Sequence, residues 1–94
     1  MKDYLPEMKT IIANYIDLQK YRLFLFGSRA EGTHRKFSDY DIGVLGPKKV
    51  PARALALMSA DLDDSDIPYR VDVIDFQSIS ESFRRVAMKE VKYL

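Results

Sequence analysis

Apolar residues recur with two different spacings along the chain, and the changes of spacing predict alternating helices and strands. Residues 3–20 have helical spacing, with Asp3 placed to cap the first turn. The apolar positions of this predicted helix are Leu5, Met8, Ile12, Tyr15 and Ile16. Residues 22–26 form a short apolar run that ends at Gly27, which is typical of a strand buried on both faces. Residues 28–37 are polar and predict one helical turn followed by a loop.

A second strand and a second long helix are predicted in the middle of the chain. Residues 39–45 alternate between polar and apolar side chains, as a half-buried strand does, and Gly46-Pro47 ends the pattern. Residues 51–62 are rich in Ala and Leu, with Pro51 at the first helical position. We therefore expect a strand, a break and a helix in this part of the chain.

The last third predicts a turn over residues 63–68, a strand over residues 69–76 and a final helix. Ser78 or Ser80 is placed to cap that helix. Its expected apolar face consists of Ile79, Phe83, Val86, Ala87 and Val91. The order αβ(α)βαβα favours an α/β (α+β) fold, in which a small mixed sheet of three strands or slightly more is flanked by helices.

Composition narrows the class of protein. A chain of 94 residues predicts one domain over residues 1–94. No apolar stretch reaches the roughly 18–20 residues of a membrane span, and the first residues do not resemble a signal peptide. The absence of cysteine fits a reducing cytoplasm, where we expect the protein. A net charge of +1 favours no direct nucleic-acid binding, so any phosphate binding must be local.

The first candidate for chemistry is Gly27-Ser28, directly after the first predicted strand. Glycine allows the backbone to come close to a ligand, and the start of a helical turn presents N–H groups to a phosphate. The hydroxyl of Ser28 adds a further donor. Taken alone, the same pair is also typical of an ordinary turn that ends a strand.

The second candidate is a set of strand carboxylates. Strand alternation places Asp39 and Asp41 on one face, where two unpaired carboxylates are costly unless a hard dication binds them. In residues 69–76 the same alternation makes Asp72 and Asp75 point to opposite faces. Asp72 lies in mid-strand and is the better third ligand, whereas Asp75 is expected to cap or close the turn. Three carboxylates suit a two-metal site for phosphoryl transfer.

Residues 26–32 (Phe-Gly-Ser-Arg-Ala-Glu-Gly) and 38–42 (Ser-Asp-Tyr-Asp-Ile) together resemble the Gly-Ser…Asp-x-Asp signature of the DNA polymerase β-like nucleotidyltransferases. Within that superfamily the chain is similar to the minimal nucleotidyltransferase (MNT) proteins. These are small bacterial and archaeal proteins, often antitoxins paired with helical HEPN-domain toxins. The motif is short, but the order of elements extends the resemblance over nearly the whole chain.

The resemblance implies a site and an activity. Gly27, Ser28 and Arg29 would bind the triphosphate of a nucleotide. Asp39, Asp41 and Asp72 would be the catalytic residues and would bind Mg²⁺, as two ions, and Asp72 would also help to deprotonate the acceptor. The implied reaction is transfer of AMP, or another nucleoside monophosphate, from ATP to a protein hydroxyl.

The acceptor is expected to be a HEPN-type toxin supplied in trans, in a hetero-oligomer, because the chain lacks the helical substrate domain of larger family members. The alternative is a non-catalytic antitoxin that inhibits a HEPN partner by forming a complex. Modification of a small molecule is a third option, which the missing second domain disfavours.

Other patterns share these residues. The spacing of Gly27 and Gly32 matches a P-loop, but the required lysine is replaced by Thr33 and no long helix follows. An EF-hand loop starting at Asp61 would need glycine where Asp66 stands. Both are rejected.

The basic residues Arg29, Arg35 and Lys36 flank the predicted phosphate site. They would either draw in the triphosphate or belong to a solvated loop, and the sequence leaves both interpretations open.

Overall fold

The computed structural model describes residues 2–94, so Met1 of the predicted domain lies outside the described residues. Four strands form one sheet in the order β3-β2-β1-β4. In the centre, β1 (Arg22–Phe26) runs antiparallel to β2 (Tyr40–Leu45) and to the short β4 (Lys92–Tyr93). On the other side, β2 runs parallel to β3 (Val71–Asp75). The predicted mixed sheet of three strands or slightly more is therefore confirmed, and its fourth strand is β4.

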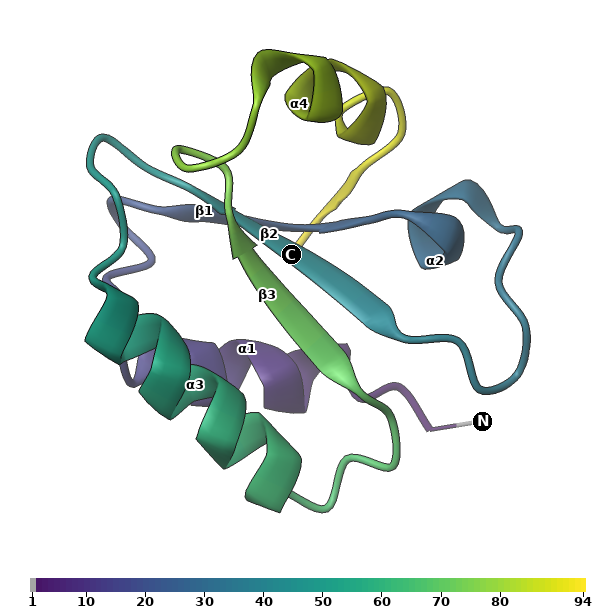
Figure 1. Cartoon of the computed structure of the whole chain (residues 1–94). Coiled ribbons are helices and arrows are strands. Elements are labelled where there is room, and N and C mark those ends of the chain that lie inside the picture. The colour runs from purple at the N-terminus through teal and green to yellow at the C-terminus, as the bar shows by residue number, and fades with distance from the viewer. Residues whose placement is uncertain (1) are drawn as a thin grey trace.

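Helices cover both faces of this sheet (Figure 1). One face is covered by α1 (Leu5–Ala13) and α3 (Ala52–Asp64), and the other by α4 (Glu81–Ala87). The single turn α2 (Ser28–Glu31) follows β1 directly. Strand alternation accordingly divides the buried side chains into two groups, one for each face.

The larger core lies between the sheet and the helices α1 and α3. Its fully buried members include Met8, Ile12, Ile42, Val44 and Met58. The smaller core, on the α4 side, consists of Phe24, Phe26 and Phe76, whose rings meet edge-on or tilted. Asp75 is the one buried charged residue in the described part of the chain.

The first helix was predicted over residues 3–20, which is too long. The observed helix α1 ends at Ala13, and residues 14–20 form turns whose apolar side chains still pack against the core. The helix ends in tighter turns, in which the N–H of Asn14 donates to the Ile11 carbonyl and that of Tyr15 to the Ile12 carbonyl. Farther along, the Asp17 carboxylate accepts a hydrogen bond from the N–H of Gln19. Such local bonds compete with the helix. Asp3 accepts from the N–H of Leu5, although Tyr4 occupies the N-cap position.

The prediction for the last helix is correct in its cap and wrong in its extent. Ser80 is the N-cap and accepts from the N–H of Phe83. The helix ends at Ala87, so Val91 lies beyond it, in the segment that leads into the unpredicted strand β4. Its predicted apolar face is divided, because Ile79, Ala87 and Val91 pack against the smaller core whereas Phe83 is 46% and Val86 66% exposed. Two residues are too short to show strand periodicity, which is why β4 escapes prediction.

The other boundaries differ by a few residues. Asp39 precedes β2, and Pro51 is the N-cap of α3 rather than its first residue. The strand β3 is shorter than predicted at both ends. No helix within residues 2–94 has the length and apolar character to cross a membrane.

Candidate active site

Gly27 forms the turn between β1 and α2. Its φ of 74° and ψ of −156° lie in a region that is essentially restricted to glycine. A Cβ on this residue would lie 2.5 Å from Oδ2 of Asp41, so the absence of a side chain lets that carboxylate rest against the turn. The Gly27 carbonyl accepts from the N–H groups of Ala30 and Glu31, which starts the helical turn at Ser28. The structure thus brings the Gly-Ser turn and Asp41 together, as predicted.

Asp41 and Asp72 occupy matching positions on neighbouring strands. In the parallel ladder Asp41 is the partner of Asp72, and in the antiparallel ladder it is the partner of Phe26. In-register residues on adjacent strands, about 4.8 Å apart, point to the same face. That face is the one covered by α4, because Ile74 and Phe26 of the same parity pack in the smaller core.

The electrostatics of Asp41 place all three predicted carboxylates in one neighbourhood. Burial, and then the negative charges of Asp72 and Asp39, raise the pKa of the Asp41 carboxyl above its ordinary value. A divalent cation with a preference for oxygen ligands would remove this repulsion. The chemistry of the donor set, three carboxylates, is therefore of the kind that Mg²⁺ prefers.

In this structure the three carboxylates of Asp39, Asp41 and Asp72 are not arranged around a common metal position. Within residues 2–94, no group of three His, Cys, Asp or Glu side chains is arranged to hold a metal ion. Asp72 instead accepts from Nε of Arg70 at 3.3 Å, and that pair together with the charge of Asp39 raises the pKa of Arg70. Asp39 is exposed and the Asp72 side chain is 37% exposed, so solvent reaches both carboxylates.

Asp75 has a different task, as its strand parity predicts. Its carboxylate is buried and accepts from the N–H of Val50 at 2.7 Å, from the N–H of Gln77 at 3.0 Å and from the Ser78 hydroxyl at 3.3 Å. These bonds tie the start of α3 to the end of β3. Asp75 therefore closes the turn and is not available to a ligand.

Arg29 is not brought together with the carboxylates. Its guanidinium lies over the ring of Tyr40, 3.9 Å from the centroid, and Tyr40 packs in the larger core on the opposite face from Asp41. Arg35 and Lys36 are exposed in the loop that follows α2. The sequence does not single out Tyr40 or Tyr69, the second ring that Arg29 contacts, although strand parity already places Tyr40 opposite Asp41.

The two rejected motifs are also absent from the structure. The turn α2 has four residues, far short of the helix that follows a P-loop. Asp61, Asp63 and Asp64 belong to α3 rather than to a calcium loop, and Asp61 accepts a hydrogen bond from the Tyr15 hydroxyl.

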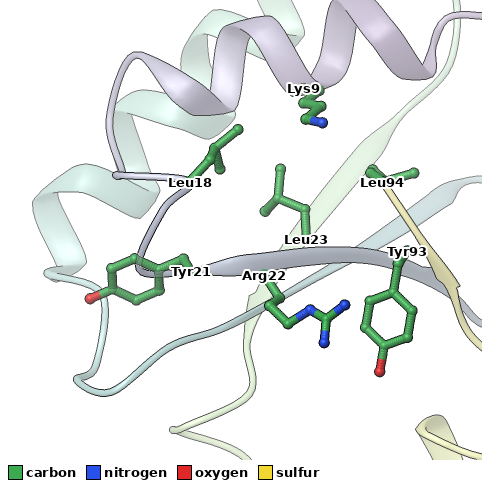
Figure 2. A pocket seen from close by; sticks show the side chains of 7 residues that line it. All are labelled: Lys9, Leu18, Tyr21, Arg22, Leu23, Tyr93 and Leu94. Carbon is green, nitrogen blue, oxygen red and sulfur yellow. The ribbon is translucent and has the colours of Figure 1, made fainter.

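A cavity of about 140 Å³ lies elsewhere, at the edge of the sheet where β1 meets β4 (Figure 2). Its lining consists of Lys9, Leu18, Tyr21, Arg22, Leu23, Tyr93 and Leu94. Arg22 lies over the ring of Tyr93, 4.3 Å from its centroid. None of the predicted site residues lines this cavity, so it is not a candidate for the catalytic centre.

Comparison with known proteins identifies the family of the chain. The family model described as "Polymerase beta, Nucleotidyltransferase" matches residues 7–94. A relative from Haemophilus influenzae, named "Probable protein adenylyltransferase MntA", is 32% identical over 82 residues, which are 87% of this chain and 70% of the relative.

Solved structures share the fold. A toxin–antitoxin complex with AMP-PNP contains a chain that superposes with a TM-score of 0.77 at 24% identity, over 94% of this chain and 69% of that chain. In a complex of an MNT antitoxin with a tri-AMPylated HEPN toxin from Shewanella oneidensis, the TM-score is 0.70 at 20% identity, over 94% of this chain and 66% of that chain. The resemblance inferred from the Gly-Ser and Asp-x-Asp motifs is confirmed, and the chain belongs to the polymerase β nucleotidyltransferase family.

Proposed function

We propose that this chain transfers AMP from ATP to a hydroxyl group of a partner protein. The acceptor oxygen attacks the α-phosphorus, the bond from that phosphorus to the β-phosphate oxygen breaks, and pyrophosphate leaves. The acceptor proton passes to a carboxylate of the site, for which Asp72 is our candidate. The observation that carries the proposal is the in-register pair Asp41–Asp72 beside the Gly27 turn.

Each part of the site has a task in this reaction. Gly27 and Ser28 would hold the triphosphate, since the turn lacks a side chain and offers N–H and hydroxyl donors next to Asp41. Asp39, Asp41 and Asp72 would hold Mg²⁺, which when bound neutralises charge on the α-phosphate and the leaving group. Most of the catalysis would then come from positioning and charge neutralisation.

The partner we propose is a HEPN-domain toxin. The Haemophilus influenzae relative is named a protein adenylyltransferase, and two of the structures with the same fold are complexes of a toxin with an antitoxin. One of those toxins is described as tri-AMPylated. These names support a protein as the acceptor and AMP as the transferred group.

The test is a labelling experiment with a helical partner protein, Mg²⁺ and ATP. ATP labelled at the α-phosphate should transfer its label to the partner, whereas ATP labelled at the γ-phosphate should not, because the γ-phosphate leaves with pyrophosphate. Label from the γ-position would mean phosphoryl transfer and would overturn the proposal.

Neutralisation of the partner separates catalysis from simple occlusion. A variant with Asp39, Asp41 and Asp72 all changed to Asn should still bind the partner but should no longer neutralise it at substoichiometric amounts. Full neutralisation by this variant at the wild-type dose would instead assign the activity to complex formation alone.

A further inference from the structure

Arg29 is enclosed by two aromatic rings. Its guanidinium carbon lies 3.9 Å from the ring centroid of Tyr40 and 4.7 Å from that of Tyr69. The two rings meet edge-on, with centroids 5.2 Å apart. Stacking of a planar guanidinium on aromatic faces is a stable arrangement that a lysine ammonium reproduces poorly.

The edge of the same guanidinium binds the loop that precedes β2. Nε of Arg29 donates to the carbonyl of Ser38 at 2.9 Å, and Nη2 donates to the carbonyl of Lys36 at 3.3 Å. The Ser38 hydroxyl in turn accepts from the N–H of Arg35 at 2.8 Å. One side chain thus fixes a loop of otherwise exposed residues to the folded core.

These contacts converge on Asp39. Ser38 precedes it and is held through its carbonyl, while Tyr40 follows it and is held through its ring. Asp39 itself is exposed and lies one residue before β2, outside the strand ladder. Its position relative to Asp41 therefore depends on its two neighbours and, through them, on Arg29.

We propose that Arg29 is a positioning residue that sets the place of the Asp39 carboxylate from the opposite face of the sheet. The inference rests on the proposed function in one respect, the use of Asp39 as a metal ligand. It differs from the simpler expectation that Arg29 binds the triphosphate. A triphosphate ligand needs only a positive charge at the right place, whereas a positioning residue needs the planar fork and the two rings.

The distinguishing variants are Arg29→Lys, which keeps the charge, and Tyr40→Leu, which removes the ring and leaves Arg29 in place. Tyr40→Phe, which keeps the ring, and Arg35→Lys, in the same exposed loop, are the matched controls. Thermal unfolding would show that each variant is folded. Arg29→Lys retains the aliphatic stem of the side chain and is therefore expected to fold. It is sufficient for the test if Tyr40→Leu does not fold.

Binding of Mn²⁺ alone, followed by electron paramagnetic resonance, and hydrogen exchange over residues 33–40 give two readouts that need no transfer activity. Arg29→Lys and Tyr40→Leu should each weaken Mn²⁺ binding about 10–100-fold, the usual loss when a residue that orients a metal ligand is changed. Both should also speed exchange in the loop. The two control variants should match the wild type in both measurements.

Kinetics provides the third readout. Arg29→Lys should lower kcat and raise the Mg²⁺ concentration required, with little change in the KM for ATP. If Arg29→Lys raised the KM for ATP but bound Mn²⁺ and exchanged loop hydrogens as the wild type does, the inference would be overturned. Arg29 would then be assigned to binding of the triphosphate. A wild-type protein that transfers no AMP would contradict the proposed function, while Mn²⁺ binding and exchange would still decide the role of Arg29.

Discussion

Asp41 lies opposite Asp72 across the parallel ladder of β2 and β3, and the same Asp41 carboxylate rests against the backbone of Gly27. Two like charges at matching positions on adjacent strands destabilise a sheet. Burial adds to this cost, and the pKa of Asp41 is raised as a result. A fold that keeps such a pair gives up stability at the point where our proposal places the metal and the α-phosphate.

Asp41→Asn should therefore stabilise the chain in the absence of metal. The raised pKa means that the folded state holds the Asp41 proton more tightly than the unfolded chain does. This contribution to stability is complete below the ordinary value of 3.8 and is lost as the pH rises through the raised pKa. At neutral pH, relief of like-charge repulsion of about 0.2–1 kcal/mol corresponds to an increase in Tm of about 1–8 °C.

Thermal unfolding of both proteins from acidic to neutral pH checks this prediction. The difference in Tm should be small at acidic pH and should increase toward neutral pH. A variant that is less stable than the wild type at neutral pH would contradict the prediction.

Mg²⁺ should raise the Tm of the wild type in a concentration-dependent manner, because a ligand that binds only the folded state stabilises it. At a Mg²⁺ concentration 100 times the Kd, the stabilisation would be about 2.7 kcal/mol. Asp41→Asn should show little of this response, and NaCl at matched ionic strength is the control. An equal response of the two proteins would place the ion elsewhere.

Gly27→Ala should abolish transfer, and Gly32→Ala provides a matched control. Both glycines have positive φ, 74° and 79°, so alanine at either position strains the backbone by about 1–3 kcal/mol. Only at Gly27 does the new Cβ meet the Asp41 carboxylate, since nothing lies within 4 Å of a Cβ at Gly32. Gly32→Ala should lose stability but retain transfer at low temperature. Loss of transfer in both variants would assign the effect to strain alone.

Asp75→Ala and Asp72→Ala should have opposite phenotypes. Removal of the Asp75 carboxylate leaves the buried N–H of Val50 without its acceptor, which costs about 1–3 kcal/mol. Asp72 is partly exposed and, within residues 2–94, is paired only with Arg70, so its loss should leave stability nearly unchanged and abolish transfer. Urea unfolding and the transfer assay, both carried out below the Tm of each variant, distinguish the two. A stable, inactive Asp75→Ala would reverse the assignment.

Strand alternation predicted the most from the sequence. It separated Asp72 from Asp75 correctly, because a side-chain period of two leaves no freedom once the strand is placed. Helix periodicity predicted less, since Tyr15 and Ile16 continue the apolar pattern into the turns that follow the last helical residue, Ala13. Their side chains still pack against the core. The apolar pattern therefore predicted correctly that these residues are buried, but not that their backbone is helical.

The contacts of Arg29 with aromatic rings could not be predicted from the sequence, for another reason. The sequence shows that Arg29 is close to Gly27-Ser28, and proximity along the chain suggested a phosphate ligand. The two rings that Arg29 contacts, Tyr40 and Tyr69, come together only when β2 pairs with β3. Tertiary contacts of this kind have no local signature.

The most direct test is the rate of AMP transfer by Asp41→Asn compared with the wild type, with α-labelled ATP and a HEPN-type acceptor, at a temperature where both are folded. We predict a fall of at least about 100-fold, as when one stabilising group of an active site is lost, together with an equal or higher Tm. Transfer at the wild-type rate by the folded variant would show that the Asp41–Asp72 pair is not the catalytic centre.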